Sequence, residues 1–291
     1  MSKFSEVLGN SQKLDGGAMF GNVPRALWEK WSTPDEKGRI NLACRTFLIE
    51  NDNENILLET GIGAFFEPKL VDRFGVQTPN QHQLLENLAS LDKDPKDIQW
   101  VILSHLHFDH AGGLLPTYDE IQQGHEELVF ENARFVVSEE AWKRAIDPHP
   151  RDQASFIPGL VDKLQASGRL HIVKQGASSP VWPEHIEFIY SHGHTPGHMH
   201  TLIQGEKNKL FFAGDLVPGT AWVHLPITMG YDRFPEQVIN EKMTMYERAE
   251  KEQWEILYTH DPIVACSQIG RNEKNQYIAT HKIAKPQRLR F

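Results

Sequence analysis

Residues 100–113 read Trp-Val-Ile-Leu-Ser-His-Leu-His-Phe-Asp-His-Ala-Gly-Gly. The apolar run 100–103 is typical of a short buried strand, and it leads directly into three histidines and one aspartate. A loop leaving such a strand can turn its first two histidines toward one point, and the aspartate and third histidine toward a neighbouring point. Imidazole nitrogens and carboxylate oxygens suit zinc and similar divalent metals. The stretch therefore predicts a metal site, whose candidate ligands are His105, His107, Asp109 and His110.

Three further candidate ligands lie downstream, each just after an expected strand. They are His194 after strand 186–190, Asp215 after strand 210–213 and His260 after strand 255–258. Strands are rigid elements, and a preorganised metal site needs ligands that rigid elements hold in place. The downstream residues therefore extend the predicted metal site.

The rest of the chain predicts a mixed α/β protein. Further strands are expected at 40–50, 56–59, 135–137, 170–173 and 199–204, the first two forming a hairpin. Helices are expected at 24–31, 81–91, from 138 onward and at 235–253. In the last of these, Val238, Ile239, Met243, Tyr246 and Ala249 share one face. Residues 14–20 and 145–160 are interpreted as loops.

The histidine motif resembles the H-x-H-x-D-H signature of metallo-β-lactamase-fold hydrolases. The later family positions, a lone histidine, a bridging aspartate and a final histidine, are matched in order by His194, Asp215 and His260. The resemblance extends over residues 40–265. It implies the α/β class and a four-layer αββα sandwich, and we expect a single domain covering residues 1–291.

The resemblance also implies how the ligands are shared between two divalent metal ions. His105, His107 and His194 would hold the first ion, Asp109, His110 and His260 the second, and Asp215 would bridge them. Zinc is the default metal, while iron, manganese and cobalt fit the same donors. A hydroxide bridging the two ions would attack a carbonyl. Asp109 would also act catalytically, by passing a proton to the leaving group.

Within this family the sequence is most similar to the quorum-quenching N-acyl homoserine lactonases. Phe108, inside the histidine motif, is typical of those enzymes, and residues 14–21 resemble a segment that approaches their active site. We therefore expect the protein to open lactones, specifically N-acyl homoserine lactones, with a small-molecule lactone or ester as its substrate. Residues 1–38 are expected to form an extension near the active site or a homodimer interface.

The resemblance departs from the lactonases at two places. Their tyrosine shortly after the bridging aspartate is replaced here by the segment 216–219, Leu-Val-Pro-Gly. Glu59 stands where the family usually has an aspartate. The alternative function is therefore a phosphotriesterase or arylesterase that uses the same dinuclear site.

Several residues outside the ligand set are candidates for the substrate pocket. They are Phe20, Phe108, Trp222 and His224, although for any single aromatic residue a place in the core is favoured over a place in the pocket. His198 is expected to orient a loop beside the ligands rather than to bind metal. His82, His125, His149, His171, His185 and His281 are expected at the surface.

Composition excludes several other classes of partner. The 291 residues carry a formal net charge of −9 and no basic stripe, which argues against nucleic acid. No apolar run of about 18 residues is present, so no membrane span is expected. The N-terminus lacks a signal-peptide pattern and only two cysteines occur, so we expect a cytoplasmic protein. The basic run 282–290 is interpreted as a solvated tail.

Overall fold

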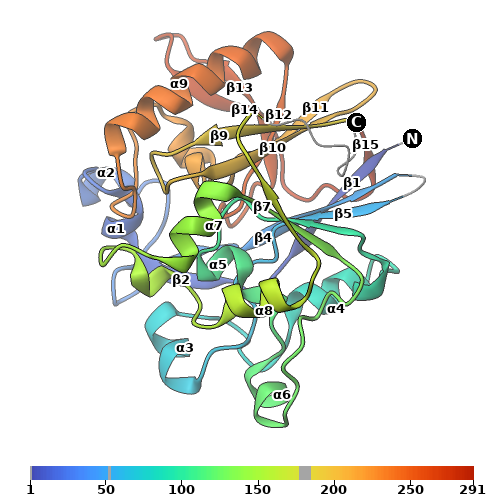
Figure 1. The fold of residues 1–291 in the computed structure, drawn as a ribbon. Coiled ribbons are helices and arrows are strands. Elements are labelled where there is room, and N and C mark those ends of the chain that lie inside the picture. The colour runs from blue at the N-terminus through green and yellow to red at the C-terminus, as the bar shows by residue number, and fades with distance from the viewer. Residues whose placement is uncertain (1, 52–53, 177–184) are drawn as a thin grey trace. The chain divides into compact units, whose positions relative to one another are not determined.

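A computed structural model describes residues 2–51, 54–176 and 185–291, and its chain divides into two compact units (Figure 1). Unit 1 comprises Met1–Gln12, Ala43–Ser178 and Gln287–Arg290. Unit 2 comprises Lys13–Leu42, Ser179–Pro286 and Phe291. Each unit has its own large sheet and its own hydrophobic core.

The sheet of unit 1 has the strand order β15-β1-β4-β5-β6-β7-β8. Its strands are β1 (Lys3–Leu8), β4 (Arg45–Glu50), β5 (Asn55–Leu58), β6 (Trp100–Ile102), β7 (Arg134–Ser138), β8 (Leu170–Val173) and β15 (Leu289–Arg290). The pairs from β5 to β8 are parallel, and the others are antiparallel. Strands buried on both faces need continuous apolar sequence, which β6 supplies and which the sequence prediction used.

Short helices pack against this sheet or connect its strands. They are α3 (Pro68–Phe74), α4 (Gln83–Ala89), α5 (Phe108–Ala111), α6 (Tyr118–Gln122), α7 (Glu139–Ile146) and α8 (Leu160–Ala166), with 3-10 turns at Pro95–Asp97, Gly112–Leu114 and Gln153–Ser155. Leu84 and Leu88 of α4 lie one turn apart and are both fully buried, which explains the helical period read from the sequence. Helix α5 carries the second half of the histidine motif.

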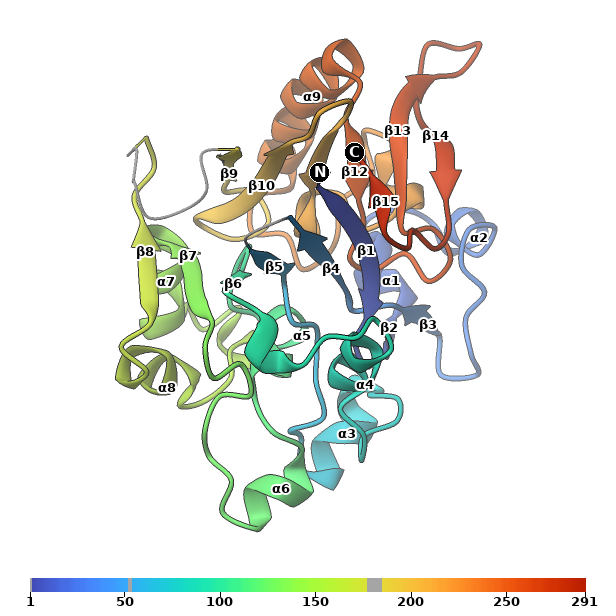
Figure 2. The same cartoon turned by 90° about the vertical axis from the view of Figure 1, so that its right-hand side faces the viewer.

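The sheet of unit 2 has the strand order β14-β13-β12-β11-β10-β9 (Figure 2). Its strands are β9 (Ile186–Ser191), β10 (His198–Gln204), β11 (Lys209–Phe212), β12 (Glu255–Leu257), β13 (Cys266–Arg271) and β14 (Tyr277–Ile283). A separate two-stranded sheet pairs β2 (Gln12–Asp15) with β3 (Arg39–Leu42). The helices are α1 (Gly16–Phe20), α2 (Arg25–Trp28) and α9 (Pro235–Glu252), with 3-10 turns at Gly214–Leu216 and Thr220–Val223.

The strand directions of unit 2 bring its candidate ligands to one edge of the sheet. Strands β11 and β12 are parallel, so the residues that follow them, Asp215 and His260, leave the sheet at the same edge. Strands β9 and β10 are antiparallel and joined by the loop 192–197, which carries His194. Strand β10 also runs antiparallel to β11, so this loop lies at that edge too.

Three predictions about local structure are wrong. Residues 14–20 are not a loop, because they complete β2 and form α1, whose first turn is capped by Asp15 through a 2.7 Å hydrogen bond from Ala18 N. The strand expected at 40–50 is two strands, β3 and β4, which belong to different sheets. The basic run 282–290 is not simply a tail, because β15 pairs with β1.

Two predictions about individual side chains are also wrong. His82 is buried rather than at the surface, and its Nε2 lies 3.1 Å from the carbonyl oxygen of Gly113. Helix α9 has the expected bounds, but Met243 is exposed, while Lys242 and Met245 are buried on the inner face. The hydrophobic pattern predicts the wrong buried face for α9, because a lysine, Lys242, lies at the centre of the face that is buried.

Within the part of the chain that the structure describes, no helix combines the length and apolar character needed to cross a membrane.

Candidate metal centre

Unit 1 supplies four of the predicted ligands from the loop after β6 and from α5. The rings of His105 and His107 meet edge to face, with His105 Nε2 3.0 Å from His107 Nδ1. Ligand nitrogens around a tetrahedral zinc at about 2.0 Å would be separated by roughly 3.3 Å, which is close to this spacing. The other nitrogen of His105 lies 2.9 Å from Ser104 Oγ, so the orientation of the ring is fixed.

His110 is held by the end of strand β5. Its Nδ1 lies 3.4 Å from Glu59 Oε2, and both side chains are fully buried. The other oxygen of Glu59 accepts a 2.7 Å hydrogen bond from Ser104 N. Thr60 donates to the carbonyl oxygen of His110 from both its backbone nitrogen and its hydroxyl. The glutamate that departs from the family pattern therefore ties the histidine loop to the neighbouring strand.

Asp109 receives a hydrogen bond from a residue that the sequence analysis missed. Gln12 Nε2 donates to Asp109 Oδ2 over 2.8 Å, and both residues are buried. The glutamine is 97 residues away in sequence, and no local pattern links the two. The hydrogen bond therefore holds the Asp109 carboxylate in one orientation.

In unit 2, Asp215 presents each of its oxygens to a different imidazole. Its Oδ2 lies 3.2 Å from His194 Nε2, and its Oδ1 lies 3.1 Å from His260 Nε2. All three residues are buried. A carboxylate whose two oxygens face separate nitrogen donors has the arrangement needed to bridge two ions. The donor chemistry and spacing within each unit thus fit divalent metal ions.

His194 is oriented by Asp232, another residue that the sequence analysis missed. His194 Nδ1 lies 2.9 Å from Asp232 Oδ1, and Asp232 Oδ2 accepts a 2.7 Å hydrogen bond from Met229 N. Carboxylates in this position fix the tautomer of a metal-binding histidine, leaving Nε2 as the ligand atom. A single aspartate 38 residues downstream gives no sequence signal for this role.

We expect Asp232→Asn to weaken metal binding by about 10- to 100-fold, because an amide holds the histidine ring less firmly in its ligating form. Competition titration with a chromophoric chelator measures this affinity. Asp35→Asn, at a carboxylate remote from the histidines in sequence and bonded to Arg39, is the control and should bind metal as the wild type does. Unchanged affinity in Asp232→Asn would contradict the orienting role.

Helix α9 anchors two loops of unit 2, the one that carries His194 and the one that leads to Asp232. Glu241 accepts hydrogen bonds from His192 N at 2.7 Å and from Gly193 N at 3.1 Å. The next residue, Lys242, is fully buried, and its Nζ donates to three carbonyl oxygens of the loop 224–227 at 2.9–3.2 Å. Two consecutive residues of one helix therefore anchor both the loop before His194 and the loop leading to Asp232.

Lys242 makes the stability of the protein depend on pH. Burial lowers the pKa of Lys242 to about 7 from the usual 10.5, and the nearby Asp232 opposes this shift. Between these two pKa values the unfolded chain keeps the proton that the folded chain releases, so stability rises with pH. Below about pH 7, Lys242 is protonated in both the folded and the unfolded chain, and the buried cation then lowers the free energy of unfolding by its full amount.

We expect Lys242→Met to lack this titration. The wild-type free energy of unfolding, minus that of the variant, should rise by about 1.4 kcal/mol per pH unit between about pH 7.5 and about pH 9. Urea unfolding at both pH values measures this difference. Lys251→Met, at an exposed lysine of the same helix, should show no such rise. A pH-independent difference for Lys242→Met would contradict the lowered pKa.

The structure places the four candidate pocket residues as follows. Phe20 is buried in the core of unit 2, stacked on Trp28 at 5.7 Å and on Trp222 at 4.5 Å. His224 is partly buried in the same unit, and burial lowers its pKa. Phe108 packs in unit 1 against Phe74 at 4.4 Å. Their roles in a substrate pocket stay predictions.

His198 bonds beside the ligands, in line with the orienting role expected for it. Its Nε2 accepts a 3.2 Å hydrogen bond from Asp215 N. Its Nδ1 lies 3.2 Å from Ser191 Oγ, which in turn lies 2.8 Å from His200 Nε2. A buried polar chain therefore runs from the backbone of Asp215 through His198 and Ser191 to His200.

Comparisons with known proteins identify the family of the chain. A family model described as the metallo-beta-lactamase superfamily matches residues 40–260. An N-acyl homoserine lactonase of Bacillus cereus is 24% identical over 183 residues, which are 59% of this chain and 62% of the relative. The chain thus spans less than two thirds of the length of that curated relative.

Solved structures give matches over nearly the whole chain. A probable metal-dependent hydrolase from Staphylococcus aureus is 30% identical, with a TM-score of 0.83 and coverage of 97% of this chain and 98% of that one. AidC, a dizinc quorum-quenching lactonase in complex with a product, is 19% identical, with a TM-score of 0.73 and coverage of 97% and 95%. The hydrolase AbOPH is 20% identical, with a TM-score of 0.75 and coverage of 96% and 94%.

The last two likenesses show the fold alone. Together with the family match, they confirm the α/β class and the metallo-β-lactamase fold expected from the histidine motif. The expected enzyme class agrees with the class named for the Staphylococcus aureus structure. The prediction of one domain over residues 1–291 stays a prediction. The chain belongs to the metallo-beta-lactamase superfamily.

Proposed function

We propose that this protein is a dinuclear-metal hydrolase that opens lactones, with N-acyl homoserine lactones as the preferred substrates. The observation that carries the proposal is Asp215, whose two oxygens each face a different imidazole within unit 2. The naming of the curated Bacillus relative as an N-acyl homoserine lactonase supports the substrate class. The buried, prearranged donors favour metal-dependent hydrolysis.

The proposed ligand set follows the family pattern. His105, His107 and His194 serve one ion, Asp109, His110 and His260 serve the other, and Asp215 serves both. When bound, such ions supply a water nucleophile that is ionised near neutral pH and polarise the carbonyl of the substrate. We propose zinc as the metal, because neutral imidazoles and carboxylates suit it well, although iron, manganese and cobalt accept the same donors.

The chain's own side chains perform the remaining tasks. Asp109, held by Gln12, is placed in the proposal to carry a proton to the alkoxide that leaves when the ring opens. Glu59 and Asp232 keep the rings of His110 and His194 in their ligating orientations. Phe20, Phe108, Trp222 and His224 are proposed to border the substrate.

We further propose that the protein acts in the cytoplasm as a homodimer, with residues 1–38 near the active site or the dimer interface. Light scattering of the purified protein tests the oligomeric state. Metal analysis by mass spectrometry of protein from unsupplemented cells tests the identity of the ions. A monomer, or a predominance of another metal, would correct these parts of the proposal and leave the hydrolase intact.

A small substrate panel tests the reaction itself. We expect purified protein with two metals per chain to open N-hexanoyl- and N-dodecanoyl-homoserine lactone far faster than a simple δ-lactone, an aryl ester or paraoxon. No turnover of any panel member by fully loaded protein would overturn the proposal. The same panel with Asp215→Ala protein shows how much of each rate depends on the metal site.

The rival function is a phosphotriesterase or arylesterase. It is favoured by the segment after Asp215, where the buried Leu216 and Val217 replace the tyrosine of the lactonases. If paraoxon or the aryl ester is the best substrate of the panel, the metal site stands as proposed and the substrate class changes.

A further inference from the structure

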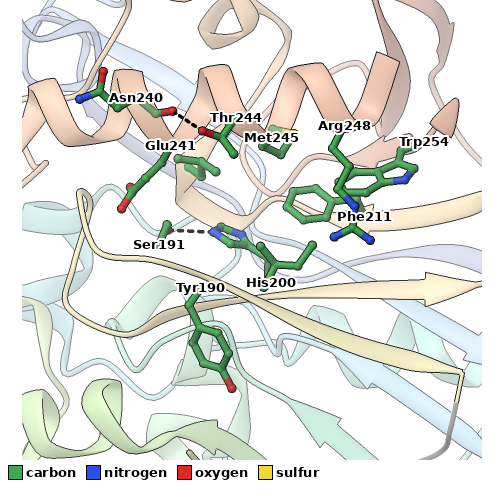
Figure 3. A pocket seen from close by; sticks show the side chains of 12 residues that line it. Tyr190, Ser191, His200, Phe211, Asn240, Glu241, Thr244, Met245, Arg248 and Trp254 are labelled. Carbon is green, nitrogen blue, oxygen red and sulfur yellow. Dashed lines mark hydrogen bonds between the residues drawn. The ribbon is translucent and has the colours of Figure 1, made fainter. Parts of the chain in front are cut away.

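Unit 2 contains a cavity between helix α9 and one face of its sheet. Its volume is about 310 Å³, within the range of about 300–1,000 Å³ that is typical of small-molecule sites. Figure 3 shows the helix with Asn240, Thr244 and Arg248 over the strands that carry Ser191 and His200. Asn240 and Thr244 are exposed, whereas Ser191 and His200 are buried, so the cavity has an open mouth and a closed floor.

One wall of the cavity is a row of flat rings. His200 stacks on Phe211 with centroids 5.2 Å apart and 28° between the planes. Phe211 stacks on Trp254 at 5.1 Å and 22° (Figure 3). Ile189, Leu216 and Met245 add aliphatic surface around these rings. These rings already stack on one another, and the Arg248 guanidinium lies 4.8 Å from the Trp254 ring centroid, so an entering molecule meets ring edges. Edge-to-face contacts of this kind favour an aromatic molecule.

The charged groups of the lining are already paired. Arg248 binds both oxygens of Glu187, at 2.7 and 2.9 Å, and also Glu252 at 2.9 Å. Glu241 accepts from two backbone nitrogens of the His194 loop and from Gln237 Nε2. Burial lowers the pKa of His200 to about 3, so its ring is neutral at physiological pH. An ion entering the cavity would therefore meet no unpaired opposite charge among these residues.

The floor of the cavity offers one neutral hydrogen-bonding pair. Ser191 Oγ lies 2.8 Å from His200 Nε2, as the dashed line in Figure 3 marks. Ser191 Oγ also lies 3.2 Å from His198 Nδ1. Because a hydroxyl has one donor and two acceptor positions, Ser191 retains one position for a hydroxyl or a carbonyl group of a ligand. The remaining lining is mostly apolar, and it selects against ligands with several polar groups.

We propose that this cavity is a binding site for an uncharged aromatic molecule of one or two fused rings that carries a single hydroxyl or carbonyl group. The ligand ring lies against the edges of Phe211 and Trp254, and the polar group reaches Ser191. All lining residues belong to unit 2, and the proposal does not depend on the lactonase reaction.

Equilibrium dialysis of the metal-loaded protein with 2-naphthol tests the site. We expect saturable binding that Thr244→Trp weakens at least tenfold, because the new ring fills the mouth of the cavity. Glu247→Trp adds the same ring at an exposed position of α9 outside the lining and should bind like the wild type. Asn240→Trp provides a second mouth variant should Thr244→Trp fail to fold.

Two further comparisons test the ligand chemistry. Ser191→Ala should weaken 2-naphthol binding by about two- to tenfold and leave naphthalene binding unchanged. 2-Naphthoate, which has the same rings and a negative charge, should bind far more weakly than 2-naphthol. No binding of 2-naphthol to the wild type, equal binding to all tryptophan variants, or preference for the naphthoate would each overturn the proposal. Substrate turnover enters none of these readouts.

Discussion

Asp215→Ala is expected to leave at most one metal ion per chain and to lower lactone turnover by about a thousandfold or more. The carboxylate faces His194 with one oxygen and His260 with the other. In the proposed dinuclear site, its loss removes a donor from both ion positions. Removing an interaction worth several kcal/mol to the transition state corresponds to a rate loss of this size. Metal content by mass spectrometry and turnover on the preferred lactone measure the two effects.

Two further variants sharpen this prediction. Asp215→Asn keeps the shape of the side chain and one oxygen, and it should fall between alanine and the wild type in metal content. Glu247→Ala, at an exposed carboxylate of α9, should change neither quantity. An Asp215→Ala protein with full metal content and full turnover would overturn the bridging assignment, whatever the substrate proves to be.

Gly113→Ala is expected to destabilise the protein by about 3 kcal/mol or more, as severe overpacking can do. A Cβ at this position would lie 2.0 Å from the carbonyl oxygen of Thr60, which is backbone and cannot rotate away. Nor is Gly113 itself free to shift, because its nitrogen donates to Gly61 O and its carbonyl oxygen lies near His82 Nε2. Urea unfolding at matched metal loading measures the loss.

Gly124→Ala separates steric overlap from the general cost of losing a glycine. Gly124 has a φ of +93°, but an added Cβ there would meet no atom within 4 Å. Its substitution should cost about 1–2 kcal/mol through backbone strain alone. If Gly113→Ala were no more destabilising than Gly124→Ala, the close approach of the backbones behind the histidine motif would not limit this position.

The candidate metal ligands can be identified from the sequence because their signal is local. Three histidines and an aspartate follow one apolar strand, and each later ligand follows a strand of its own. Parallel pairing of β11 with β12 then brings the ends of distant segments to one edge. The pattern of strands, each followed by a candidate ligand, therefore predicts both the fold class and the candidate ligands.

The residues that orient the ligands were not accessible, because they are single polar residues far away in sequence. Gln12 and Asp232 lie in segments without a recognisable spacing to Asp109 and His194, the residues that they contact. Lys242 was hidden for a different reason, since a lysine in an amphipathic helix is normally exposed. Strands β13 and β14 alternate only weakly between buried and exposed residues, so they too escaped prediction.

Because Lys242 is buried, its chemical reactivity measures how often helix α9 opens. Amine-reactive reagents acylate a lysine only when its side chain is in contact with solvent, and Lys242 has none of its surface exposed. Acylation of this residue must therefore wait until α9 separates from the loop 224–227, whereas exposed Lys251 reacts at once. Peptide mass spectrometry measures both labelling rates. Their ratio gives the frequency with which α9 separates from this loop, and no engineered label is needed.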